Sequence, residues 1–168
     1  WRLVDALLRV LRLAAGQLRL VFAERGEVDF AELTLRALEA LGPADEPTDL
    51  ALALDHRISH LLVDEFQDTS IGQFDLLARL TAGWTADDGR TLFAVGDPMQ
   101  SIYRFREAEV GLFLQARHAP VGAVRLEPLQ LRVNFRSSAG VVDWVNATFA
   151  RVMPVREDRG LGAVPFAA

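Results

Sequence analysis

The chain has 168 residues, of which 51% are apolar and 24% are charged, so it can bury a core and does not have the composition of a disordered chain. All 18 basic residues are arginine and no cysteine occurs, which excludes a disulfide framework, a thiolate metal site and any chemistry that needs a lysine. The net charge of −5 argues against a self-sufficient DNA-binding domain, although local arginine clusters could contact phosphates. Because the first residue is Trp1 rather than a methionine, we expect the chain to be a piece of a larger protein.

The first third of the chain is predicted to be helical. Residues 1–22 carry apolar side chains at helical spacing, which predicts an amphipathic helix that packs on neighbours rather than a targeting peptide. Gly26 ends this pattern, and a second helix is predicted over Phe30–Leu41 with Asp29 as its N-cap. After a turn, a short helix is predicted over Asp49–Arg57. The apolar residues that define the first helix are Leu3, Val4, Leu7, Leu8, Leu11, Leu18 and Val21.

The run Leu61–Asp64 has no polar alternation and predicts a strand buried on both faces, as in a parallel sheet. Ligands of open α/β sheets gather at the carboxyl ends of the strands, so Asp64 and Glu65 are expected at the mouth of the sheet. An Asp in that place can hold Mg²⁺ in a nucleotide-phosphate site, and the adjacent Glu can orient or deprotonate a water. Asp68 or Ser70 is expected to cap the helix that follows, and the alternative for Asp64 and Glu65 is that they only cap a helix.

A helix over Ile71–Thr81 and a second apolar strand over Thr91–Val95 are predicted next. The strand leads into Gly96-Asp97-Pro98, where glycine permits close backbone approach and Asp-Pro fixes a turn. Gln100 follows as a neutral amide that can bond a phosphate oxygen or a water.

Aromatic and cationic residues then alternate. Tyr103 and Phe105 interleave with Arg104 and Arg106, a pattern that suits unpaired bases, where each stacked base contributes roughly 1–3 kcal/mol. The alternative is that the aromatic residues belong to the core.

The last third is predicted to contain a helix over about Glu107–Arg117, a strand over Val124–Leu126, which Leu131–Phe135 extends or follows, and a final helix. Ser137 or Ser138 would cap that helix. Its inward residues would be Val141, Val142, Val145 and Phe149. Just before the helix, Arg136 would oppose the helix dipole, so an anion such as a transferring phosphate is expected to hold it.

Strands that alternate with helices predict an α/β fold with a parallel sheet and flanking helices. We expect a helical segment over 1–57, the sheet-bearing segment over 58–130 and the start of a further domain over 131–168.

Three stretches carry a resemblance to a known family. Leu62–Thr69, Val95–Arg106 and Asn134–Ser137 resemble motifs II, III and IV of superfamily-one helicases of the UvrD/Rep group, and the second stretch is most similar to the RecB/AddA-like exonuclease branch. Val28–Leu33 resembles the segment that precedes motif II in that branch. The resemblance implies a partial RecA-like motor domain of the P-loop NTPase type, with part of an inserted helical subdomain at its N-terminus. It also implies a bacterial cytoplasmic protein.

The resemblance implies roles in ATP hydrolysis for four residues. Asp64 would coordinate the Mg²⁺ of Mg-ATP, and Glu65 would activate the attacking water. Gln67 and Gln100 would sense the γ-phosphate and couple it to DNA.

It also implies contacts for a second set of residues. Arg136 would contact the γ-phosphate and Phe135 would stack on adenine. Tyr103 and Phe105 would meet the bases of single-stranded DNA, and Arg106 would support the junction between nucleotide and DNA. The parent protein would be an ATP-dependent helicase or translocase in DNA repair or recombination, with a nuclease, fused or separate, as a possible partner and no membrane.

The chain departs from the family at two positions and lacks several motifs. Glu107 stands where relatives usually have glycine, and Met99 stands where the exonuclease branch often has lysine. The P-loop needs a lysine, so this chain does not contain it, and motifs V and VI have no counterpart. We therefore expect the isolated chain neither to bind ATP tightly nor to hydrolyse it. A sheet without its P-loop strand would have an unpaired edge, which favours self-association or modest stability.

Two other classes of function remain open from the residues alone. One is a non-catalytic interaction module derived from such a motor. The other is a metal-dependent nuclease that uses Asp64, Glu65, Asp68 and Asp97, which their dispersal over two strand ends disfavours.

Overall fold

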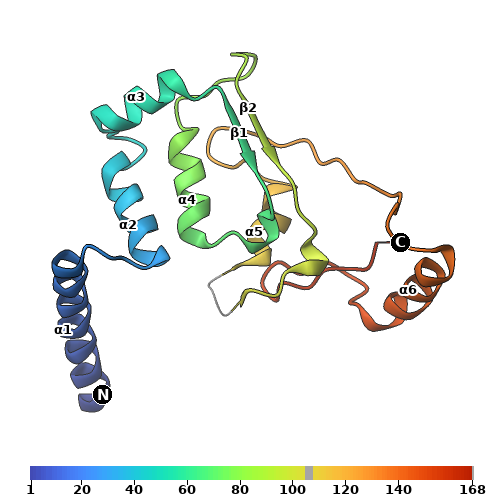
Figure 1. The fold of residues 1–168 in the computed structure, drawn as a ribbon, viewed down its shortest axis with the longest axis horizontal. Helices are drawn as coiled ribbons and strands as arrows, with labels where there is room; N and C mark the ends of the chain where they lie inside the picture. Colours follow the sequence, from blue (N-terminus) through green and yellow to red (C-terminus); the bar gives the residue numbers. More distant parts are fainter. Residues whose placement is uncertain (105–107, 168) are drawn as a thin grey trace. The chain divides into compact units, whose positions relative to one another are not determined.

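The computed structural model describes residues 1–104 and 108–167, and the chain divides into two compact units, Trp1–Arg36 and Ala37–Ala168. The fold is mixed α/β, with a parallel sheet of two strands in the second unit (Figure 1). The α/β class and the parallel pairing confirm the sequence prediction at this level. The predicted boundaries after residues 57 and 130 stay predictions.

Helix α1 (Arg2–Arg25) forms most of the first unit and ends where predicted, because Gly26 adopts a left-handed conformation (φ 67°) and donates its N–H to the carbonyl of Phe22. The prediction that its apolar residues pack on neighbours is wrong for the described chain. Leu3 and Leu11 keep 73% and 65% of their surface exposed, since no described residue covers them. None of the helices described combines the length and hydropathy that a membrane span requires.

The next two helices have the predicted bounds. Helix α2 (Phe30–Leu41) begins after Asp29, whose carboxylate accepts the N–H of Glu32 at 2.7 Å. Helix α3 (Asp49–Arg57) begins after Thr48, whose hydroxyl accepts the N–H of Ala51 at 3.3 Å. In both cases a short polar side chain satisfies a free amide at the helix start, which is why these boundaries can be predicted.

Strands β1 (His60–Val63) and β2 (Thr91–Ala94) pair in parallel, with Val63 opposite Ala94. The prediction that both faces of the sheet are buried is wrong for the described chain. Leu62 and Phe93 point to the open face and are 73% and 56% exposed. Parallel sheets normally carry cover on both faces, so these two side chains mark a surface that the described residues leave open.

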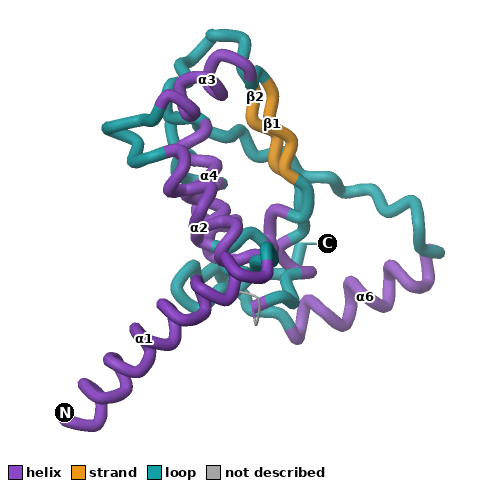
Figure 2. The backbone as a smooth tube through the Cα atoms, turned by 60° about the vertical axis from the view of Figure 1, so that its left-hand side comes forward, coloured by secondary structure: helices purple, strands orange, loops and turns teal. Residues whose placement is uncertain are grey.

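The covered face of the sheet packs on helices α4 (Ile71–Leu80) and α5 (Val110–Ala116). Helix α4 lies beside the two strands in both views (Figures 1 and 2). Phe66, which follows β1, is the centre of this core, with ring centroids 6.3 Å from Phe74 of α4 and 5.9 Å from Phe113 of α5. The core therefore lies under the carboxyl ends of the strands and supports the residues that follow them.

Two predicted strands are absent from the described residues. Val121 and Val124 exchange backbone hydrogen bonds of 2.8 and 3.0 Å across a tight turn at Gly122 (φ 59°), so residues 124–126 do not extend as a strand. Residues 131–135 form no strand, because no described strand pairs with them. Helix α5 also begins later than predicted, since Glu109 caps it through the N–H of Gly111.

The final helix α6 (Ala139–Val152) follows Ser138, one of the two predicted caps, although the side chain of Ser138 makes no capping hydrogen bond. The predicted inward face is only partly correct. Val142 and Val145 are half-buried, but Val141 is exposed. Phe149 is stabilised by ring contacts rather than by burial, with its centroid 6.3 Å from Phe166.

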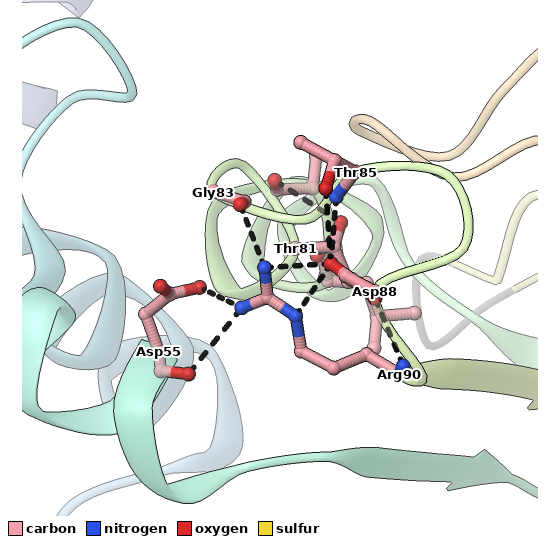
Figure 3. A network of polar contacts seen from close by, with 8 residues as sticks. Asp55, Thr81, Gly83, Thr85, Asp88 and Arg90 are labelled. Carbon is pink, nitrogen blue, oxygen red and sulfur yellow. Dashed lines mark hydrogen bonds and ion pairs between the residues drawn. The ribbon is translucent and has the colours of Figure 1, made fainter.

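A network around Arg90 anchors the start of β2 (Figure 3). Its guanidinium donates to Asp55 at 2.7 Å, to Asp88 at 2.8 Å and to the carbonyl of Gly83 at 2.8 Å, and it lies 5.3 Å from the centroid of the Trp84 ring. The hydrogen bond from Arg90 holds the pKa of the Asp88 carboxyl well below its usual range, with further help from the backbone N–H groups of Thr85 and Arg90. The network fixes the end of the sheet opposite the carboxylates that follow β1.

Candidate functional site

The carboxylate pair lies directly after β1, at the edge of the sheet where the sequence predicts it. Asp64 and Glu65 are both exposed, and the Asp64 Oδ1 accepts the N–H of Glu65 at 2.9 Å. Glu65 adopts a left-handed backbone conformation (φ 50°, ψ 42°), which is unfavourable for a residue other than glycine. The turn is held by the carbonyl of Glu65, which accepts the N–H of Asp68 at 2.9 Å.

Gln67 lies beneath this pair and is 1% exposed. Its amide nitrogen Nε2 donates to the Glu65 Oε2 at 2.6 Å and to the Asp68 Oδ2 at 3.3 Å. Its amide oxygen Oε1 accepts the backbone N–H of Asp97 at 3.0 Å. One buried side chain thus connects the residues after β1 with the residues after β2.

Gln100 lies in the 3₁₀ turn η2 (Pro98–Gln100) after β2, and its side chain is exposed. The Nε2 of Gln100 donates to the Asp97 Oδ2 at 2.7 Å, while the Asp97 Oδ1 accepts the N–H of Met99 at 2.9 Å. Asp97 therefore does more than form a turn, because it orients the amide that the resemblance assigns to the γ-phosphate. Asp-Pro at a strand end signals a turn in the sequence, but no sequence pattern reveals the bond to Gln100.

Backbone contacts join the two strand ends as well. The N–H of Phe66 donates to the carbonyl of Val95 at 2.9 Å, and the hydroxyl of Ser101 donates to the carbonyl of Gln67 at 3.3 Å. Gly96 lies so close that a Cβ there would meet the Oε1 of Gln67 and would come within 3.0 Å of the Phe66 nitrogen. The bond from Ser101 has no signal in the sequence.

Hydrogen bonds therefore link Asp64, Glu65 and Gln67 to Gln100 by way of Asp97. The two carboxylates follow β1, the Gln67 amide contacts Glu65, and the Gln100 amide contacts Asp97 after β2. Carboxylates and neutral amides at one sheet edge can hold a cation, orient a water and bond phosphate oxygens.

Asp64 fits the role of a magnesium ligand. Its Oδ2 makes no hydrogen bond to any described residue, and the side chain is exposed at the sheet edge. Magnesium in nucleotide sites usually takes one or two carboxylates together with phosphate oxygens and waters. Within residues 1–104 and 108–167, no group of three or more histidine, aspartate or glutamate side chains is placed to hold a metal ion.

The predicted DNA-binding residues are only partly described. Tyr103 is 38% exposed, and its carbonyl accepts the N–H of Ala108 at 3.3 Å. Ile102, at its side, is 70% exposed and adds an apolar contact surface that the sequence pattern does not single out. Phe105 and Arg106 lie outside the described residues.

Phe135 and Arg136 belong to a separate turn before α6. The side-chain oxygen of Asn134 accepts the N–H groups of Arg136 at 2.9 Å and Ser137 at 3.1 Å, which fixes the turn. The Phe135 ring is 91% exposed, and the Arg136 side chain is exposed too. Across the described part of the chain, no hydrogen bond, ion pair or ring contact joins these two side chains to the cluster around Gln67.

The chain is similar to known proteins over most of its length. Residues 7–120 match the UvrD/REP helicase N-terminal domain. The chain is 41% identical over 147 residues to the A subunit of the ATP-dependent helicase/nuclease of Exiguobacterium sibiricum, a match that covers 85% of this chain and 12% of the relative. The proteins of the same name from Moorella thermoacetica and Lysinibacillus sphaericus are 40% and 35% identical over 158 and 160 residues, covering 89% and 92% of this chain.

These three relatives are much longer than the chain, which spans only 11% to 13% of their length. The matched region contains the carboxylate pair after β1, the buried amide of Gln67 and the turn that carries Gln100. The chain belongs to the UvrD/REP helicase family.

Proposed function

We propose that the chain is part of an ATP-dependent DNA helicase or translocase, in which it supplies the water-activating half of the ATPase site. The observation that carries the proposal is the cluster of Asp64, Glu65 and Gln100 at the carboxyl ends of two parallel strands, joined through Gln67. Ligand sites of α/β proteins lie at that edge. The proposed fold is part of a RecA-like motor domain, whose P-loop comes from outside this chain.

In this proposal each side chain has a separate task. Asp64 holds Mg²⁺, which neutralises charge on the phosphates when bound. Glu65 accepts a proton from the attacking water, and its exposure gives that water access. Gln100 and Arg136 contact the γ-phosphate, and Phe135 stacks on adenine through its exposed ring.

The proposed polymer substrate is single-stranded DNA, reached from duplex by unwinding. Tyr103, Phe105 and Arg106 contact the strand, where aromatic stacking and arginine charge act together. The relatives are named as helicase/nuclease proteins, so a nuclease, fused or separate, is the proposed partner, and the bacterial cytoplasm is the proposed location. DNA repair or recombination is the proposed process.

The test uses the full-length protein as the gene encodes it. ATP hydrolysis is measured with and without single-stranded DNA, in the wild type and in Glu65→Gln and Asp64→Ala variants. We expect DNA to stimulate hydrolysis, and Glu65→Gln to lower kcat by about 10²–10⁴-fold while ATP binding persists, because general-base catalysis supplies that range. Asp64→Ala should weaken the dependence of binding on Mg²⁺. Absence of DNA-stimulated hydrolysis in the wild type contradicts the proposal.

The isolated chain provides a control for the origin of the activity. Because it has no P-loop, we expect titration calorimetry with Mg-ATP to show no tight binding. Tight Mg²⁺-dependent binding by the isolated chain would mean that the phosphates are held by residues other than those proposed.

A further inference from the structure

We propose that Gln67 is a positioning residue that fixes the Glu65 carboxylate and links it to the loop after β2, so that the loop which carries Gln100 controls the water-activating group. This inference rests on the proposed ATPase function. It gives Gln67 a task different from direct contact with the γ-phosphate, because its amide is already engaged on both sides and is 1% exposed.

The orientation of the Gln67 amide follows from its neighbours. The backbone N–H of Asp97 can only donate, so the oxygen of the amide must face it at 3.0 Å. The nitrogen therefore faces Glu65 and Asp68, where it donates to a carboxylate oxygen of each at 2.6 and 3.3 Å. A buried amide that lost either bond would leave a polar group unsatisfied, so the geometry is strongly favoured.

The bond to Glu65 uses only one of its two carboxylate oxygens. Oε2 accepts from Gln67, while Oε1 makes no hydrogen bond to any residue in the described part of the chain and belongs to an exposed side chain. Gln67 thus holds the carboxylate and leaves the second oxygen to meet a water. A long, exposed carboxylate side chain needs such a fixed contact to keep one rotamer.

The Gln67 side chain also contacts the loop after β2, through the backbone N–H of Asp97. Asp97 donates its N–H to Gln67 and accepts the Gln100 amide through its carboxylate, at 2.7 Å. A displacement of Gln100 that moves Asp97 must stretch the bond to Gln67 or carry the amide along. The path from Gln100 to Glu65 runs through the carboxylate and backbone N–H of Asp97 and then through the amide of Gln67. Ser101 and Gly96 hold the backbone close to this path.

The test is a double-mutant cycle in the full-length protein. Gln67→Glu keeps the shape and keeps an acceptor for the Asp97 N–H, but in its ionised form it replaces the donor to Glu65 with a second carboxylate oxygen. We expect kcat for ATP to fall about tenfold or more, with KM for ATP changed by less than about twofold, since the base is misplaced while the nucleotide contacts remain. In a Glu65→Gln background the same change should alter kcat by less than about twofold, because Gln67 acts through Glu65.

Two further variants keep the test decisive. Gln73→Glu makes the same chemical change in the exposed capping pair of α4, and we expect it to leave kcat unchanged. Gln67→Met removes donor and acceptor without adding charge, and it provides the same comparison if Gln67→Glu does not fold. We expect it to lower kcat and also to reduce the stimulation by DNA, because the bond to Asp97 is lost.

The outcomes separate this inference from the proposed function. A wild-type protein without DNA-stimulated hydrolysis overturns both. An active wild type in which Gln67→Glu and Gln67→Met both leave kcat unchanged, raise only KM, or lower kcat equally in both Glu65 backgrounds overturns the role of Gln67 alone.

Discussion

At Gly96 the loop after β2 passes close to the residues after β1. An alanine there would place its Cβ against the Gln67 amide oxygen and within 3.0 Å of the Phe66 nitrogen. Its φ is not positive, so the effect of Gly96→Ala is steric rather than conformational. We expect Gly96→Ala to destabilise the chain by about 1–3 kcal/mol, as overpacking does, and to lower ATP turnover in the full-length protein.

The prediction is checked by comparing the thermal unfolding temperature of Gly96→Ala with that of Gly140→Ala. Gly140 lies in α6, and an added Cβ there would meet no heavy atom within 4 Å, so its substitution should be neutral or slightly stabilising. Equal unfolding temperatures for the two variants would show that the close approach at Gly96 can relax at little cost.

The sequence predicts which residues lie at the candidate site more reliably than it predicts the hydrogen bonds between them. Asp64 and Gln100 could be placed because each follows an apolar strand, and the carboxyl ends of parallel strands share one edge. The burial of Gln67 could not be predicted, because its partner Asp97 is 30 positions away in the chain.

Among the elements, helix α4 provides a test of local stabilisation. Ser70 and Gln73 form a reciprocal capping box, with Ser70 accepting the N–H of Gln73 at 3.3 Å and Gln73 accepting the N–H of Ser70 at 2.9 Å. We expect Ser70→Ala to destabilise the chain by about 1 kcal/mol. Ser138→Ala is the matched control, because Ser138 precedes α6 without a side-chain capping bond and should cost less than about 0.5 kcal/mol. Chemical denaturation of both variants measures the difference, and a larger effect at Ser138 would contradict the assignment.

Element boundaries could be predicted where a capping residue or a glycine determines them, and less well where distant contacts do. Helices α2 and α3 begin and end at the predicted residues. The strand expected over 124–126 does not form, because Val124 pairs with Val121 across the turn at Gly122. The apolar residues near 131–135 pair with no strand among the described residues. Strand pairing depends on a neighbour, so periodicity alone predicts it poorly.

For the whole chain, the open face of the sheet and its unpaired edges favour self-association. Leu62 and Phe93 lie on that face and are largely exposed, and parallel sheets rarely expose apolar side chains in this way. We expect sedimentation velocity of the isolated chain to show concentration-dependent association, and the double change Leu62→Ser and Phe93→Ser to reduce it.

Ile71→Ser is the control for this prediction, because Ile71 is 62% exposed at the start of α4 rather than on the open face of the sheet. Association that responds equally to both changes would mean that general hydrophobicity, and not the sheet, drives it. A strictly monomeric chain would contradict the prediction outright.

The left-handed conformation of Glu65 has a consequence for the history of such a protein. Asparagine and glycine occupy that backbone region at lower cost than glutamate, by an amount on the order of 1 kcal/mol. Mutations that improve folding are therefore available at the position proposed to activate water, and each of them removes the carboxylate. Selection for higher stability and selection for ATP turnover therefore favour different residues at position 65. A thermostabilised descendant that keeps glutamate here must have gained its stability through substitutions at other positions.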